Sequence, residues 1–288
     1  MFRRSGPFQP TLVALLAGSA LVCGLITAPP STHADGPRWR PHPWTDPSER
    51  ASAQSCPSDM VLVHGSFCPE VEQTCLEWSD DGRGRCMQFA SPSRCLTRER
   101  VPLAFCMDRY EWPNREGVHP DVMVTFEEAD SLCRGRGRRL CTEREWTFAC
   151  EGEQMLPYPY GYDRDPYACT IDHWARAPER ALLHSATSAM EEAARVYEAS
   201  ASGTMNRCRS PFGAMDLTGN VDEWVLNESG WPYPSSLMGG FWGHVRTRCR
   251  AVTRGHGPNF RYYQIGFRCC DDEGEHSDAD RGIVSTTP

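Results

Sequence analysis

Residues 212–224 read FGAMDLTGNVDEW. Within this run a flexible glycine, Gly219, precedes an amide side chain at Asn220 and a carboxylate at Glu223. A turn at the glycine can direct both side-chain oxygens, together with backbone carbonyls between them, at a hard cation such as Ca²⁺. The alternative is that Asn220 and Glu223 hold the turn while Trp224 packs in the core. The run by itself leaves both interpretations open.

Four further segments accompany this run in a fixed order along the chain. Residues 60–67 read MVLVHGSF, and residues 105–114 read FCMDRYEWPN. Residues 137–146 read GRRLCTEREW. The last segment begins with GGFW at residues 239–242 and closes with IGFRC at residues 265–269. One such motif would be weak evidence for a resemblance to a protein family, whereas five motifs in a fixed order are specific evidence.

Together the five segments resemble the formylglycine-generating enzyme family, also called the sulfatase-modifying factor domain. The match runs over about residues 56–271. The resemblance implies an α+β fold: one compact, disulfide-rich domain with a C-type-lectin-like core and little regular secondary structure. It also implies a calcium site, for which the matching ligands are Asn220, Val221 and Glu223.

The catalytic chemistry of the family depends on two cysteines, and here at most one is present. Catalytic members hold copper(I) with two thiolates in the pattern GGSxxCxxxxC, because soft sulfur ligands suit this ion. The matching stretch, residues 239–249, reads GGFWGHVRTRC. Counted forward, His244 takes the first cysteine position and Cys249 the second. Counted backward from Arg254, the second position falls on Arg246, because this segment is shorter than that of the family.

Two roles therefore remain open for His244 and Cys249. As candidate catalytic residues, an imidazole and one thiolate can bind copper, and iron is a second candidate metal. In the other role Cys249 is structural: the resemblance implies a bridge to Cys150, and a second bridge from Cys133 to Cys269 or its neighbour Cys270. The even number of cysteines outside the signal segment favours the structural role.

Arginine and aromatic residues crowd the same part of the chain. They suit the binding of an anionic or peptide ligand. The alternative is a lattice of cation–π contacts and ion pairs that holds the loops together. The residues that we assign to ligand binding are Trp242, Arg246, Arg250, Arg254 and His256, and Arg248, Phe260, Tyr262 and Tyr263 lie among them in the sequence.

The composition excludes several classes of function. The chain of 288 residues contains no lysine, so all 30 basic residues are arginine. This excludes Schiff-base and pyridoxal-phosphate chemistry and a P-loop, which all need a lysine. The net charge of −8 argues against nucleic-acid binding.

The N-terminal segment and the cysteines indicate export to the periplasm or the extracellular space. Residues 1–34 have the charged start, apolar stretch and small residues of a signal peptide. A lipid anchor at Cys23 is the alternative, and no other apolar run is long enough to span a membrane. Outside this segment 14 of the 15 cysteines remain, an even number in an exported chain, which predicts seven disulfides.

Local patterns predict several elements. Thr125 with Glu128, and Thr142 with Glu145, are capping boxes that each begin a helix. A third helix is expected over residues 188–198, within an insertion at 175–202. We expect bridged loops over residues 56–106, and strands and turns over 237–270. Residues 35–55 are expected to be a linker and 272–288 an acidic tail.

These observations predict an exported sulfatase-modifying-factor-like protein that lacks the paired catalytic cysteines and works as a binding module. Its partner would be a protein, a peptide or an anionic ligand. The alternative is a divergent, oxygen- and metal-dependent oxidoreductase of the same superfamily. The fold alone does not choose between them.

Overall fold

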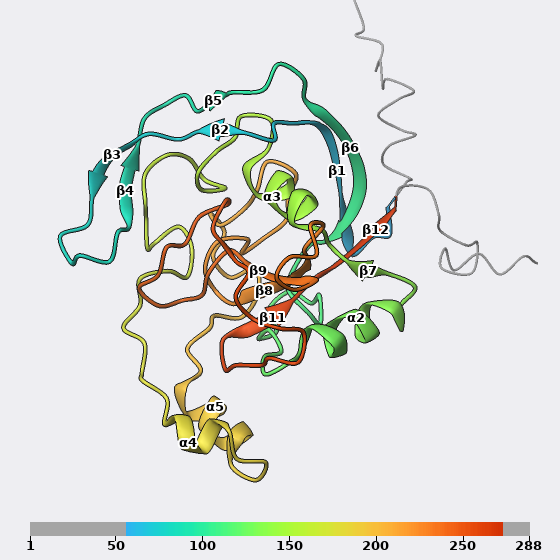
Figure 1. Ribbon diagram of the computed structural model, residues 1–288, viewed down its shortest axis with the longest axis vertical. Coiled ribbons are helices and arrows are strands. Elements are labelled where there is room, and N and C mark those ends of the chain that lie inside the picture. Colours follow the sequence, from blue (N-terminus) through green and yellow to red (C-terminus); the bar gives the residue numbers. More distant parts are fainter. Residues whose placement is uncertain (1–55, 273–288) are drawn as a thin grey trace, which may run out of the picture. The chain divides into compact units, whose positions relative to one another are not determined.

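The computed structural model describes residues 56–272 (Figure 1). The expected signal peptide at 1–34, the linker at 35–55 and all but the first residue of the tail at 272–288 lie outside this range. Among the described helices, none combines the length and the apolar character that crossing a membrane requires.

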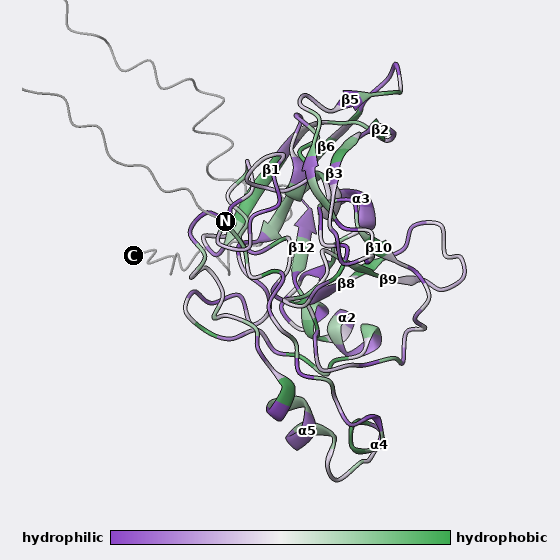
Figure 2. Ribbon diagram, turned by 90° about the vertical axis from the view of Figure 1, so that its left-hand side faces the viewer, coloured by the Kyte–Doolittle hydropathy of each residue, from purple (hydrophilic) through white to green (hydrophobic). Residues whose placement is uncertain are grey.

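One four-stranded sheet joins the two ends of the described chain, in the order β1-β6-β12-β7. Strands β1 (Met60–Phe67) and β6 (Val101–Asp108) are antiparallel over eight residue pairs, and β12 (Cys269–Asp272) pairs with β6 and with β7 (Arg139–Leu140). Strand β1 is largely hydrophobic (Figure 2). Its β-branched, apolar residues bury one side of the sheet in the main core.

A second four-stranded sheet carries the two glycine-containing motifs, in the order β10-β9-β8-β11. Its central strands, β8 (Asp222–Leu226) and β9 (Ser235–Met238), are antiparallel. Strand β11 (Ile265–Phe267) runs parallel to β8, and β10 (Val252–Thr253) pairs with β9. The sheet thus brings the GNVDEW motif beside the GFR motif.

The segment 56–106 differs from the prediction, because it contains strands and not only bridged loops. Besides β1 and β6 it forms two small pairs. Strand β2 (Val71–Glu72) pairs with β5 (Arg94–Cys95), and β3 (Cys75–Trp78) pairs with β4 (Cys86–Phe89). These strands form one arm in Figure 1, with β3 and β4 at the end remote from β1 and β6.

The two helices with capping boxes are confirmed. Helix α2 (Phe126–Arg134) begins after Thr125, and α3 (Glu143–Glu151) begins after Thr142. In both, the threonine hydroxyl accepts a hydrogen bond from the third helical backbone N–H, and the glutamate at that position accepts one from the threonine N–H. The segment 175–202 holds two short helices, α4 (Arg180–Leu183) and α5 (Ala189–Val196), which project from the sheets (Figure 1).

A buried ion pair joins the two central motifs. The guanidinium of Arg268, in the GFR motif, donates to both carboxylate oxygens of Glu223 at 2.7 Å. Its other N–H groups donate to backbone carbonyls, including that of Met215 at 2.9 Å. The Trp146 indole also donates to Glu223, at 2.8 Å. Because every group in this network is paired, two charges can be buried between the sheets and α3.

Two more carboxyl groups, Glu111 and Asp216, lie close to this ion pair. Burial raises the pKa of Glu111 to about 8, with the negative charge of Asp216 adding to the effect and Arg268 opposing it. Burial likewise raises the pKa of Asp216 to about 6. One arginine therefore faces more carboxyl groups than it can neutralise, and Glu111 keeps its proton near neutral pH.

All fourteen cysteines of the described residues form disulfides. The pairs are Cys56–Cys106, Cys68–Cys95, Cys75–Cys86, Cys133–Cys269, Cys141–Cys270, Cys150–Cys249 and Cys169–Cys208. The bridges from Cys133 to Cys269 and from Cys150 to Cys249 are those that the resemblance implies. The second of these ties α3 to the arginine-rich segment after β9.

We predict that the protein loses stability between about pH 4.5 and 8, and that Glu111→Gln reduces this loss. The unfolded chain releases the Glu111 proton near pH 4.5 and the folded chain near pH 8, so folding takes up a proton in between. Stability therefore falls as the pH rises through this window. Melting curves should show a pH-dependent drop in Tm that is smaller in Glu111→Gln by about 3 °C or more.

The control for this experiment is Glu127→Gln, which removes an equal charge from an exposed position on α2. It should leave the pH dependence of the wild-type protein unchanged. A Glu111→Gln variant whose Tm falls as steeply with pH as that of the wild type would contradict the buried, protonated Glu111.

We also predict that the folded, exported protein contains no thiol that reacts with iodoacetamide. A digest under non-reducing conditions should release a peptide pair that joins residues 150 and 249, since these cysteines are bonded. Reduction in denaturant should make all fourteen cysteines reactive. Labelling of Cys249 in the folded protein would contradict the structure.

Candidate functional site

The turn at Gly219 is shaped by close packing. Gly219 has a φ of 82°, and a Cβ at this position would lie 2.3 Å from the carbonyl oxygen of Thr170, so only glycine fits. Asn220 follows with a φ of 55°. Its side-chain oxygen accepts from the Ser200 N–H at 2.8 Å, and its amide donates to Glu111 at 2.8 Å.

These contacts do not fit the predicted calcium site. Both oxygens of Glu223 already bind Arg268, and the side-chain oxygen of Asn220 faces a backbone N–H. Val221 could offer only its backbone carbonyl, and its side chain packs in a hydrophobic cluster. A guanidinium at hydrogen-bond distance from the carboxylate occupies the position in which a cation would be held. Across residues 56–272, no group of three or more His, Cys, Asp or Glu side chains is arranged to hold a metal ion. The other interpretation, in which Asn220 and Glu223 hold the turn, describes their contacts.

Gly239 and Gly240, which both have positive φ, turn the chain after β9. Gly239 has a φ of 87°, and a Cβ there would lie 2.8 Å from the Leu217 carbonyl oxygen. Trp242, which we expected to bind ligand, is instead completely buried. It packs against Tyr197 and Tyr263, with ring centroids 5.6 and 5.8 Å away. It therefore anchors the segment, and it is not among the residues that line the large cavity.

The two candidate catalytic residues do not form a metal centre in this structure. Cys249 is buried, and its sulfur is bonded to Cys150. The bonded sulfur is not a thiolate, so the residues present do not fit the two-thiolate copper(I) site of the catalytic members. His244 is partly exposed and lies at the edge of the cavity described next.

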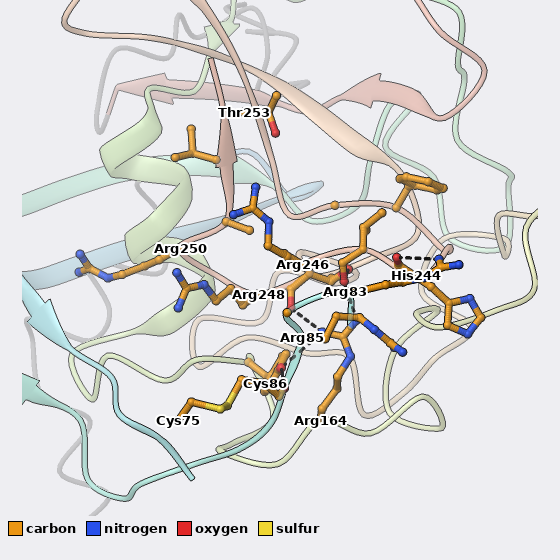
Figure 3. A pocket seen from close by; sticks show the side chains of 18 of the residues that line it. Cys75, Arg83, Arg85, Cys86, Arg164, His244, Arg246, Arg248, Arg250 and Thr253 are labelled. Carbon is orange, nitrogen blue, oxygen red and sulfur yellow. Dashed lines mark hydrogen bonds between the residues drawn. A yellow bond between two sulfur atoms is a disulfide. The ribbon is translucent and has the colours of Figure 1, made fainter. Parts of the chain in front are cut away.

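A cavity of about 910 Å³ lies between the β3–β4 hairpin and the segment that follows β9 (Figure 3). The hairpin contributes Trp78, Arg83 and Arg85, and the Cys75–Cys86 bridge lies in the same wall. The opposite wall is the segment from Gly240 to Thr253. The arginines that line the cavity are Arg83, Arg85, Arg164, Arg246, Arg248 and Arg250.

Four of these arginines are held by carboxylates, and the first, Arg83, pairs with Asp81 at 3.5 Å. Arg85 and Arg164 both pair with Asp172, and Arg85 also pairs with Asp81 at 2.6 Å. Arg164 further donates to the carbonyls of the opposite wall, at 3.0 Å for Thr247. These contacts fix the arginines in place before any ligand arrives, which lowers the entropy cost of binding.

The fourth, Arg250, is held against α3. Its guanidinium binds both carboxylate oxygens of Glu151 at 2.6 and 2.7 Å and donates to the carbonyls of Cys68 and Pro69. The planar guanidinium matches the carboxylate in a two-pronged geometry. This contact lies directly beside the Cys150–Cys249 bridge, because Glu151 and Arg250 each follow one of the bonded cysteines.

Arg246 and Arg248 are different, since neither has a carboxylate or carbonyl partner for its guanidinium among the described residues. Arg246 is exposed and Arg248 is partly buried. Burial lowers the pKa of Arg248, and the positive charges of Arg246 and Arg250 act in the same direction. Arginine nevertheless stays charged at any physiological pH. Two unneutralised guanidinium groups therefore face the cavity.

The other predicted ligand-binding residues lie elsewhere. Arg254 forms an ion pair with Glu143 of α3. His256 stacks on Phe260 at 4.1 Å between ring centroids, and it lines a neighbouring cavity of about 340 Å³ and not the large one. Burial lowers the pKa of His256, so its ring is neutral at physiological pH. Of the five predicted residues, the structure brings only Arg246 and Arg250 to the large cavity.

The sequence analysis did not assign Trp78, Arg83, Arg85 or Arg164 to a site. They come from parts of the chain far from the arginine-rich segment: Arg83 donates to the carbonyl of His244 across 161 residues of sequence. No local pattern marks such contacts. Arg248 was recognised as part of the cluster but not selected, although it alternates with Arg246 and Arg250 along the chain.

Comparisons with known proteins agree with this fold. Residues 51–273 match the description "Sulfatase-modifying factor enzyme 1-like domain". The chain is 29% identical over 168 residues to a Bos taurus protein named inactive C-alpha-formylglycine-generating enzyme 2, covering 54% of this chain and 51% of that protein. It is 31% identical over 186 residues to the formylglycine-generating enzyme of Mycobacterium tuberculosis, covering 62% and 50%.

The chain thus spans about half the length of these relatives. Among solved structures, PvdO from Pseudomonas aeruginosa is similar at 19% identity with a TM-score of 0.46, covering 77% of this chain and 96% of that one. With the five motifs in order and a match over residues 51–273, the chain belongs to the family of sulfatase-modifying factor enzyme 1-like domains.

Proposed function

We propose that this protein is an exported binding module that holds an anionic ligand in the arginine-lined cavity. The observation that supports the proposal most directly is the pair Arg246 and Arg248, whose guanidinium groups face the cavity without an acidic partner in the described residues. Arg246 is exposed and Arg248 is partly buried, so both can reach a ligand, and an anion would neutralise their charge through charge-assisted hydrogen bonds.

The surrounding protein strengthens this attraction. The chain as a whole carries a net charge of −8, so the cavity is a positive region on an acidic protein. Low-dielectric walls concentrate the field of such a region and raise the local concentration of oppositely charged ligands. Since the arginines lie on a disulfide-bonded frame, the site is largely formed before binding.

The alternative, a metal-dependent oxidoreductase, finds less support. Its chemistry at this position would require a free thiolate at Cys249, and that sulfur is bonded to Cys150. The seven disulfides themselves favour an oxidising compartment outside the cytosol. We therefore assign the scaffold a binding role in this protein, with export to the periplasm or the extracellular space.

The proposal predicts that inorganic phosphate binds the wild-type protein and that the double variant Arg246→Gln, Arg248→Gln loses this binding. Charge-assisted hydrogen bonds from two guanidinium groups would be lost, so the Kd should rise about tenfold or more. Isothermal titration calorimetry at constant ionic strength, with chloride as the reference anion, measures the change.

A second double variant, Arg94→Gln with Arg261→Gln, is the matched control. It removes the same number of charges from exposed positions outside the cavity. It should bind phosphate like the wild type. Equal losses in both double variants would mean a general charge effect, and no phosphate binding by the wild type would equally contradict the proposal.

A further inference from the structure

The cavity is larger than a simple anion requires, and the side chains that line it are chemically more varied. A volume of about 910 Å³ is typical of sites for whole small organic molecules, whereas a bare oxyanion would fill only a corner of it. Its lining also includes apolar and aromatic side chains, among them Phe89, Phe241 and Val252. A ligand that fills this space has an apolar part in addition to its charged group.

Trp78 is the clearest candidate to receive that apolar part. Its side chain lines the cavity but is 60% exposed, and it belongs to none of the hydrophobic clusters of the described residues. An indole left open to water at the edge of a cavity is a surface on which a second ring can stack. Strand β3 holds it in place, because Trp78 is opposite Cys86 in the strand pair, next to the Cys75–Cys86 bridge.

The two walls are linked, so Trp78 and the unpaired arginines belong to one site. Arg83, between β3 and β4, donates to the carbonyl oxygen of His244 at 3.4 Å. Figure 3 shows Arg246 and Arg248 in the middle of the group, with Arg250 to one side and Arg83 and Arg85 to the other. A ligand held by the central arginines can therefore reach the hairpin wall.

The charge of the cavity indicates the charge of the ligand. Six arginines line it, and three carboxylates form ion pairs with them: Asp81, Asp172 and Glu151. Asp222 also lines the cavity, but burial raises its pKa to about 7, so it carries only part of a negative charge at neutral pH. At least two positive charges are therefore left over. A phosphate monoester carries close to two negative charges at neutral pH, whereas a sulfate ester carries one, so the phosphate is the better match.

Arg85 adds a second observation of unmet hydrogen bonding. The residue is only 7% exposed, and its Nε has no acceptor among the described residues even though both terminal nitrogens are bound to carboxylates. Buried donors in folded proteins nearly always have a partner.

Resting on the proposed anion-binding function, we infer that the ligand is an aromatic phosphate monoester, with its phosphate on Arg246 and Arg248 and its ring on Trp78. The phosphate oxygens accept hydrogen bonds from the two guanidinium groups, and the aromatic ring covers the exposed indole. Binding involves no covalent step.

The test compares four small probes on the disulfide-bonded protein: phenyl phosphate, phenyl sulfate, inorganic phosphate and benzyl alcohol. Calorimetry should show that phenyl phosphate binds about three- to tenfold more tightly than inorganic phosphate, because of the added ring contact. It should also bind more tightly than phenyl sulfate. Benzyl alcohol, which has no charge, should not bind measurably.

Variants then locate the ring. Trp78→Ala should remove the advantage of phenyl phosphate and leave the affinity for inorganic phosphate unchanged, while Trp78→Phe should keep part of it. Trp231→Ala is the matched control, since this tryptophan is 79% exposed and lies outside the cavity. Unchanged disulfides and circular dichroism verify that each variant is folded.

The outcomes separate this inference from the proposed function. One outcome is phosphate binding that depends on Arg246 and Arg248, with no higher affinity for phenyl phosphate or no loss of that advantage in Trp78→Ala. This outcome overturns the inference of an aromatic ligand and leaves the proposed anion binding intact. Tighter binding of phenyl sulfate than of phenyl phosphate overturns the inference that the ligand carries two negative charges. Absence of binding by both phosphates overturns both proposals.

Discussion

The bond between Cys150 and Cys249 is the constraint on which the candidate site depends. It closes a loop of 99 residues and fastens the end of α3 to the arginine-rich segment. The backbone of Cys249 is held as well, because its N–H donates to the Pro157 carbonyl at 2.9 Å. Because its sulfur is bonded, Cys249 cannot act as a thiolate. Arg248 and Arg250 flank it in the sequence, so the bond also sets the position of two cavity arginines.

In the core, too, contacts within the protein occupy groups that could otherwise hold a metal ion. The sequence of the GNVDEW motif suits a metal cation. In the structure its carboxylate, Glu223, binds the guanidinium of Arg268, and its amide, Asn220, donates to Glu111. Arginine, the only strong cation in this lysine-free chain, thus takes the central place in the turn. Positive charge on arginine side chains organises both the core and the cavity in the described part of the protein.

Sequence reasoning succeeded where the signal was local and where the motifs were specific. The capping boxes at Thr125 and Thr142 specified both helix starts, because the hydrogen bonds that they form span three residues. It failed over residues 56–106, where dense cysteines concealed the apolar run of β1. It also misplaced Trp242, since an aromatic residue in a glycine-rich segment has the same local pattern whether it packs inward or faces a ligand. The hairpin wall of the cavity was not predictable, because it meets the arginine segment only in the folded chain.

The central claim is that sulfur in this protein is structural and that the cavity is built for an anion. Titration of the folded, exported protein with copper(I), in competition with a chromophoric chelator, tests it most directly. We expect no stoichiometric uptake of copper, because the sulfur of Cys249 is bonded to Cys150. Tight binding of one copper(I) ion per chain, with copper–sulfur bonds seen by X-ray absorption, would contradict the account.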